Sequence, residues 1–227
     1  LLLLLPACLF VAYAGNLLGY ALQWALDLAF PFELLPQVVE PSAEHLGLQM
    51  ALVTLASPAM EELVFRCCLI DRLRPFGERA ALVTSALAFG LFHGSANQLC
   101  YGLLLGLVFG YVYLRTGRLR YSLALHATIN AMSSVVLPAL LMAVSGAAAG
   151  AGVDAASVSL ASVASDPGVM ALLAYLALLF VLTLLGSVVF ALGVSERRIR
   201  PGGVTLRDAL TSWGMVAFIV VTLAALL

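Results

Sequence analysis

Three apolar stretches of this 227-residue chain carry ionisable side chains. The first holds the adjacent acids Glu61 and Glu62, followed by Arg66; the second holds His93, and the third holds His126. An ionisable side chain at the depth of a bilayer is energetically costly, so such residues are rarely kept without a task. Together these side chains predict a hydrolytic site buried within a lipid-embedded bundle of helices.

The spacing of the acids predicts different roles for them. Residues four apart share one face of a helix, so Glu62 and Arg66 are expected to pair within their own helix. Each partner would then offset the other's cost of burial. Glu61 points about 100° away around the helix, which leaves it free to face the interior. A carboxylate in that position is suited to act as a general base.

Two further motifs place functional groups on single helix faces. Phe89 is followed four residues later by His93, and His126 is followed four residues later by Asn130. One imidazole can share proton handling with Glu61, while the second imidazole and the carboxamide can donate hydrogen bonds to an oxyanion. A carboxylate base, a water molecule and two oxyanion donors are sufficient to hydrolyse an amide. We therefore expect these groups to surround one cavity.

The elements that position these residues are expected to be transmembrane helices. Hydrophobic residues make up 63% of the chain and charged residues only 10%, whereas a soluble domain is about half apolar and a quarter charged. A helix needs about 20 apolar residues to cross the hydrocarbon. We expect an all-α, polytopic bundle that forms a single domain over residues 1–227. Its seven expected spans are 1–24, 46–70, 79–93, 98–115, 120–144, 168–192 and 208–227.

The charges outside the spans predict the topology. All eleven basic residues are arginines, and most lie in three clusters around 72–79, 115–120 and 197–207. The polar segments 25–45 and 145–167 contain acids but no arginine or lysine. By the positive-inside rule the arginine-rich loops are cytoplasmic. The clusters lack interleaved aromatic residues, so no nucleic-acid partner is expected. Segment 145–167 is interpreted as a mobile outer loop or a broken helix.

Glycines recur every fourth residue in the fourth expected span, at Gly102, Gly106 and Gly110. Small residues at this spacing let helix backbones approach closely in lipid. We interpret the stripe as a packing surface.

The three motifs resemble those of a family of intramembrane proteases that process CAAX proteins and bacteriocins, the CPBP or Abi family. The motifs are Glu61-Glu62-Leu-Val-Phe-Arg66, Phe89-Gly-Leu-Phe-His93 and His126-Ala-Thr-Ile-Asn130. They occur in the family's order, and the resemblance covers about residues 46–135, the expected catalytic core. It includes a relationship to the type II CAAX prenyl endopeptidase.

The resemblance implies a role for each matched residue. Glu61 would activate a water molecule together with His93, and His126 with Asn130 would form the oxyanion site. The supporting residues would be Glu62, Arg66 and Phe89. The implied activity is a metal-independent, glutamate-type endopeptidase in a prokaryotic plasma membrane, with a membrane-associated protein or peptide as substrate. Relatives have eight spans, so we expect an N-terminal piece to be missing.

Other interpretations remain open at this stage. The same protease could be metal-dependent, with Glu61, His93 and His126 as Zn²⁺ ligands and water in a fourth position. A non-catalytic membrane protein for binding or immunity would keep the bundle without turnover. A transporter would use the buried acids and histidines as a proton relay, although no inverted repeat is evident. Neither the substrate nor the oligomeric state follows from the sequence.

Overall fold

The structure is a computed structural model, and nearly all of its described residues are helical. It describes residues 4–29, 46–150 and 166–193, together with 210–211, 215–216 and 219–220. No strand occurs within these ranges. The predicted all-α fold is therefore confirmed.

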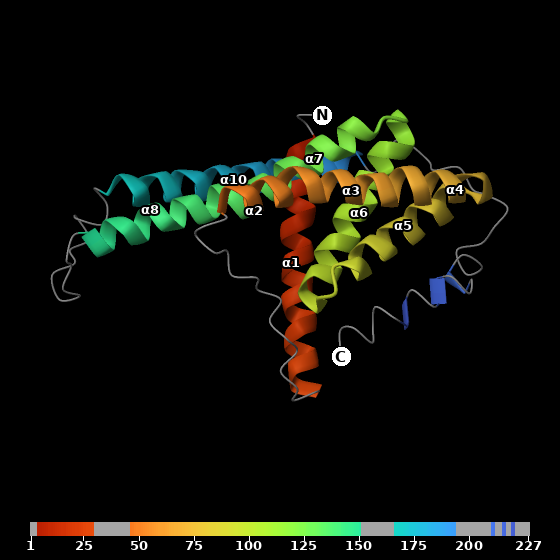
Figure 1. Ribbon diagram of the computed structural model, residues 1–227, viewed down its shortest axis with the longest axis horizontal. Coiled ribbons are helices and arrows are strands. Elements are labelled where there is room, and N and C mark those ends of the chain that lie inside the picture. Colours follow the sequence, from red (N-terminus) through yellow and green to blue (C-terminus); the bar gives the residue numbers. More distant parts are fainter. Residues whose placement is uncertain are drawn as a thin grey trace.

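Six helical rods make up the longer described segments (Figure 1). The first is α1 (Leu4–Ala29), and the second, here called helix 46–73, contains the adjacent acids. Helix 46–73 comprises α2 (Leu46–Ala51), η2 (Leu52–Ala56), α3 (Ser57–Glu62), η3 (Leu63–Ile70) and α4 (Asp71–Leu73), and a short 3₁₀ turn, η4 (Arg74–Phe76), follows it. The others are α5 (Glu78–Phe92), α6 (Ala96–Thr116), the continuous α7 (Leu119–Ala131), η5 (Met132–Val136) and α8 (Leu137–Gly150), and finally α10 (Pro167–Gly193).

Three segments of these rods are π-helical: η2, η3 and η5. A π-helical turn disturbs the regular backbone ladder and occurs often near functional sites. In each segment one backbone carbonyl accepts a hydrogen bond from a side chain of another helix. The donors and acceptors are Asn130 Nδ2 to Val53 O at 3.1 Å, Ser85 Oγ to Phe65 O at 2.7 Å, and Tyr175 Oη to Met132 O at 2.9 Å. The π-helical turns thus join helices through polar contacts.

A proline follows the first of these turns. Pro58 has no N–H, so it cannot donate to the carbonyl of Val53, its partner five residues earlier in a π-helical ladder. The Val53 carbonyl therefore lacks this backbone donor. The amide of Asn130 supplies the missing donor, and helix 46–73 is thereby joined to α7.

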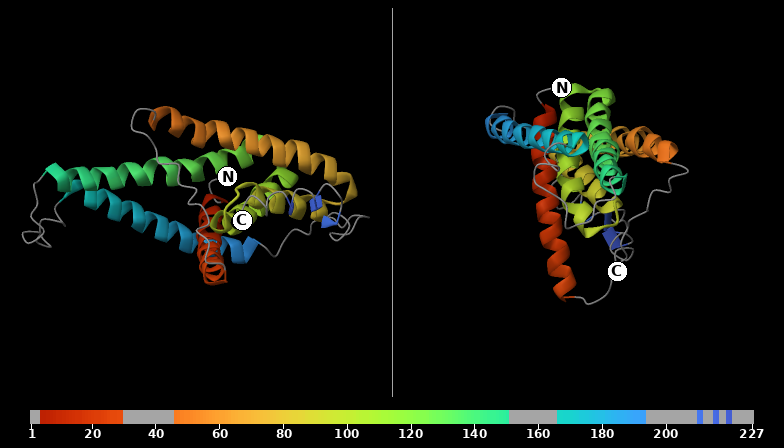
Figure 2. Two further views of the ribbon diagram at one scale, coloured as in Figure 1. Left: turned by 60° about the horizontal axis from the view of Figure 1, so that its bottom comes forward. Right: turned by 90° about the vertical axis from the view of Figure 1, so that its left-hand side faces the viewer.

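The helices pack around α6, which lies between α1 and α5 (Figure 2). The largest apolar core contains Cys8 of α1, Phe109 of α6, Leu125 of α7 and Leu179 of α10. Helix 46–73 contacts both α5 and α7, so its acids lie between the two helices that carry the histidines. In Figure 1, α1 crosses the direction that α8, α10 and helix 46–73 share.

The glycine stripe of α6 packs against α5, as predicted. A Cβ atom added to Gly102 would lie 3.2 Å from the Cα atom of Gly90, and one added to Gly106 would lie 3.0 Å from the Cα atom of Ala86. Gly110 faces the same side, against the side chain of Leu82 in α5. These close approaches bring the helix that carries the second motif directly against α6.

Four of the described helices are long and apolar enough to cross a membrane: Leu4–Ala29, Ala96–Thr116, Leu119–Val144 and Pro167–Val188. They correspond to four of the seven expected spans. The expected spans 46–70 and 79–93 are helical but do not meet the same combination of length and hydropathy. The last expected span, 208–227, falls mostly outside the described residues. The count of seven stays a prediction.

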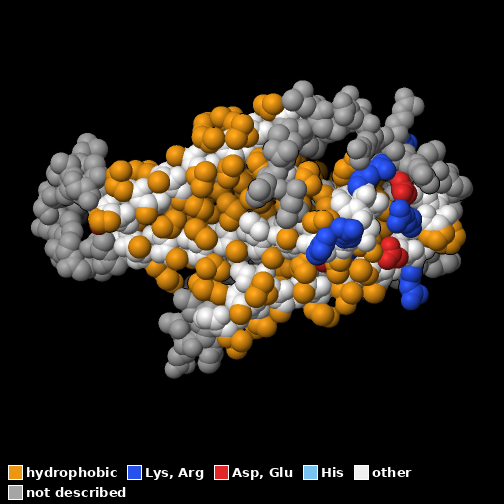
Figure 3. Space-filling model, turned by 90° about the horizontal axis from the view of Figure 1, so that it is seen from above, with side chains coloured by type: hydrophobic (Ala, Val, Ile, Leu, Met, Phe, Trp, Pro, Cys, Tyr) orange, Lys and Arg blue, Asp and Glu red, His pale blue; other side chains and the backbone are white. Residues whose placement is uncertain are grey.

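The expected loop boundaries need two corrections. Residues 25–29 belong to α1, and residues 145–150 belong to α8 rather than to an outer loop, because both rods continue beyond the predicted ends of their apolar stretches. Residues 30–45 and 151–165 lie outside the described part of the chain. Figure 3 shows the charged side chains gathered at one end of the face that it presents, with hydrophobic side chains over the rest.

Candidate active site

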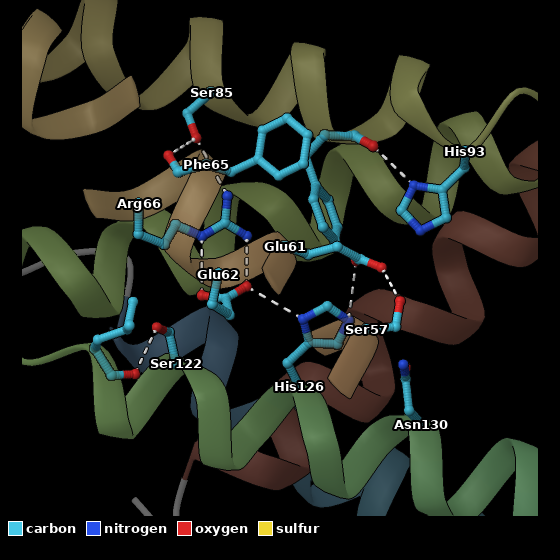
Figure 4. Close-up of polar contacts among 12 residues, drawn as sticks. Ser57, Glu61, Glu62, Phe65, Arg66, Ser85, His93, Ser122, His126 and Asn130 are labelled. Atoms are coloured by element: carbon cyan, nitrogen blue, oxygen red, sulfur yellow. Dashed lines mark hydrogen bonds and ion pairs between the residues drawn. The ribbon is translucent and has the colours of Figure 1, made fainter. Parts of the chain in front are cut away.

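A buried ion pair lies at the centre of the polar cluster drawn in Figure 4. Arg66 donates from Nη2 to Glu62 Oε1 at 3.0 Å and from Nε to Glu62 Oε2 at 3.1 Å. Both side chains are fully buried, with 0% of their surface exposed. The two parallel hydrogen bonds form the fork-to-fork geometry in which guanidinium and carboxylate pair best. The predicted pairing of these two residues is confirmed.

Arg66 also has partners on other helices. Its Nη1 atom donates to Ser85 Oγ at 3.2 Å, and its guanidinium lies over the ring of Phe89 at 4.9 Å and near that of Phe109 at 5.9 Å. Ser85 in turn donates to the carbonyl of Phe65. The sequence interpretation missed Ser85; its signal is a hydroxyl on an apolar helix, four residues before Phe89.

His126 lies between the two acids. Its Nδ1 atom is 3.2 Å from Glu62 Oε1, and its Nε2 atom is 3.7 Å from Glu61 Oε2. The ring is buried and stacks on Phe109, with the centroids 5.0 Å apart. A carboxylate can only accept, so Nδ1 carries the proton that is shared with Glu62. His126 therefore connects the buried ion pair to Glu61.

The two oxygens of Glu61 have different surroundings. Oε1 accepts a hydrogen bond from the hydroxyl of Ser57, one helical turn earlier. Oε2 is buried, and no described residue forms a hydrogen bond with it. Buried carboxylate oxygens normally have a partner, so an exception calls for an explanation. Oε2 is the acceptor that this site leaves open for a proton.

Phe89 brings both histidines into the same site. Its ring contacts His93 edge-on at 4.9 Å and His126 at 5.5 Å. His93 caps the end of α5, where its Nδ1 atom donates to the carbonyl of Phe89 at 2.7 Å. The other ring nitrogen of His93, Nε2, is then an acceptor. The Phe89 ring therefore contacts both histidines, while a shared cavity around Glu61, His93, His126 and Asn130 stays a prediction.

Asn130 reaches the site from α7, one turn after His126. One N–H of its amide is donated to Val53 O at 3.1 Å. The amide has two N–H donors, so one remains for another acceptor. Figure 4 shows Asn130 on the same side of the cluster as Ser57. The sequence predicted Asn130 as an oxyanion donor but not its bond to helix 46–73.

A zinc site would need Glu61, His93 and His126 to converge as ligands. Within the described part of the chain, no three His, Cys, Asp or Glu side chains form a group that could hold a metal ion. The Nδ1 atoms of both histidines are paired with protein oxygens, which leaves Nε2 as the ring nitrogen that could ligate a metal. Because the described side chains form no such group, we derive no chemical step through a metal.

An all-helical fold with membrane-spanning helices and a buried ionisable centre defines the protein as a polytopic membrane protein with a candidate catalytic site. Residues 43–132 match the family model described as type II CAAX prenyl endopeptidase Rce1-like. The match spans less than half of the chain; it agrees with the resemblance of the three motifs and, at the coarse level, supports a membrane-associated peptidase. All the motif residues lie within the match. Comparison with curated proteins and with solved structures gave no match.

Proposed function

We propose that the protein is a glutamate-type intramembrane endopeptidase that hydrolyses peptide bonds of membrane-associated proteins or peptides. The observation that carries this proposal is the buried Oε2 atom of Glu61, which no described residue partners, beside His126. The proposed peptidase activity agrees with the Rce1-like match. A CAAX-type substrate is supported by the family match alone. The proposal therefore names the substrates only as membrane-associated proteins or peptides.

The chemistry begins with a water molecule between Glu61 and the scissile carbonyl. Oε2 of Glu61 takes a proton as the water oxygen attacks the carbonyl carbon, with Nε2 of His93 as a second acceptor nearby. His126 donates to the developing oxyanion when both its ring nitrogens carry protons, and the remaining N–H of Asn130 is the second donor. The proton on Glu61 then passes to the leaving amide nitrogen, and the peptide bond breaks.

Glu62, Arg66 and Phe89 support these groups. The Glu62 carboxylate is held by two hydrogen bonds from Arg66 and fixes the ring of His126 through Nδ1. The Phe89 ring lies against both imidazoles. A catalytic group that is held in place before the reaction accelerates it more, because no entropy is lost in ordering that group during the reaction.

The test compares Glu61→Gln with the native protein in membrane vesicles. Gln keeps the shape of the side chain but cannot accept the proton, so cleavage should be lost while thermal stability in detergent is kept. Glu78→Gln is the matched control, because Glu78 starts α5 and pairs with Arg74, away from the site. Comparative proteomics of membranes containing native or Glu61→Gln protein would identify substrates. A Glu61→Gln protein that retains full biological effect would favour a binding or immunity protein instead.

We propose further that the reaction needs no metal ion. Purified protein should then be fully active with less than equimolar bound zinc, and strong chelators should leave its rate unchanged. Equimolar zinc that is lost with activity on chelation, and restored with it, would favour the metal-dependent alternative.

A further inference from the structure

The hydroxyl of Ser57 is directed differently from most hydroxyls on these helices. A serine or threonine inside a helix commonly donates back to the carbonyl four residues earlier. Five described hydroxyls do so: Thr54, Thr116, Thr128, Ser133 and Thr183. Ser57 instead donates forward to the carboxylate of Glu61.

The usual acceptor for Ser57 has a donor from another helix. The carbonyl four residues before Ser57 is that of Val53, which accepts from Asn130. A carbonyl oxygen can accept two hydrogen bonds, so this contact alone does not redirect Ser57. The Ser57 hydroxyl nevertheless donates to the acid one turn later.

We propose that Ser57 is a positioning residue that orients the general base, a role that rests on the proposed peptidase function. By holding Oε1 of Glu61, Ser57 prevents the carboxylate from rotating and leaves Oε2 as the reactive oxygen. Oε2 lies 3.7 Å from Nε2 of His126, too far for a direct hydrogen bond. In this proposal Oε1 of Glu61 is held by Ser57, and Oε2 accepts the proton.

This arrangement also gives Asn130 a second role. Its bond to Val53 joins α7 to helix 46–73 one turn before Ser57, the residue that donates to Glu61. In the third sequence motif, Asn130 thus reaches this helix through a backbone carbonyl, whereas His126 contacts Glu62 directly.

The experiment measures kcat, KM and the melting temperature of Ser57→Ala and Ser57→Thr in detergent or vesicles. Loss of a hydrogen bond to a charged group should lower kcat about ten- to a hundredfold. KM and melting temperature should stay near native values, because the Ser57 side chain is exposed and belongs to none of the described apolar clusters. Ser57→Thr keeps a hydroxyl and should recover most of kcat. The matched control is Thr54→Val, which removes a hydroxyl one turn earlier on the same helix.

The outcomes separate this proposal from the proposed function. A native protein that cleaves no membrane peptide, with or without Ser57, would remove the peptidase function itself. A cleaving native protein whose Ser57→Ala variant matches Thr54→Val in kcat would overturn the role of Ser57 alone. Equal losses of kcat in Ser57→Ala and Ser57→Thr, or a loss that follows melting temperature, would also overturn it.

Discussion

Removing one partner of the fully buried pair Glu62–Arg66 should destabilise the protein more than removing one partner of a partly exposed pair. In Arg66→Gln the carboxylate of Glu62 loses two hydrogen bonds from the guanidinium and keeps His126. In Glu62→Gln the buried guanidinium keeps Ser85 and the face of Phe89 but loses its anion. Each variant leaves a charge without its counter-charge in a fully buried position.

The expected cost follows from this burial. Breaking a buried ion pair by removing one partner costs about 3–5 kcal/mol, because the remaining charge stays desolvated. For a chain of 150–250 residues, each kcal/mol lowers the melting temperature by about 2–4 °C, so the expected loss is on the order of 10 °C. Replacing both partners removes both charges and should recover part of this loss.

Thermal unfolding in detergent, followed by the fraction of protein that remains monodisperse, measures these differences. Arg74→Gln is the matched control, because Arg74 pairs with Glu78 at the same spacing of four residues, with Arg74 45% and Glu78 11% exposed. Solvent screens this partly exposed pair more than the fully buried one. Arg74→Gln should therefore lower the melting temperature clearly less than Arg66→Gln does.

Two results would refute this reasoning. The first is an Arg66→Gln variant as stable as Arg74→Gln, since it would mean that the pair is not desolvated. The second is a fully stable but inactive Glu62→Gln beside an active Glu61→Gln. That combination would show that the two carboxylates have exchanged the roles proposed here.

Two further predictions concern packing and topology. A Cβ atom at Gly90 would lie 2.7 Å from the backbone oxygen of Leu99, so Gly90→Ala should force α5 and α6 apart and lower both melting temperature and activity. The control is Gly47→Ala, which should change neither, because nothing lies within 4 Å of a Cβ atom at that position. Equal melting temperatures of the two variants would contradict the close packing. Single cysteines should be labelled from the cytoplasm at residue 117 and from outside at residue 154; labelling of 154 only from inside would reverse the orientation.

Local spacing made several features of this protein predictable from sequence. The hydropathy of the chain specified helices, and a separation of four residues specified the pairing of Glu62 with Arg66. The same rule placed Phe89 beside His93. The glycine stripe of α6 predicted a close helix contact but not its partner, α5. These features depend on one helix at a time, whose geometry follows from its own residues.

Contacts between helices could not be predicted in the same way. The family resemblance implied that Glu61 acts with His93 and that His126 lies at the oxyanion, whereas the structure places His126 between both acids. Nothing in the sequence indicated that Asn130 bonds to Val53. Which side chains meet across helices depends on the rotation and depth of each rod, and π-helical turns change both. The sequence alone therefore determined which groups are present, and the packing of helix 46–73 against α5 and α7 decided which of them touch.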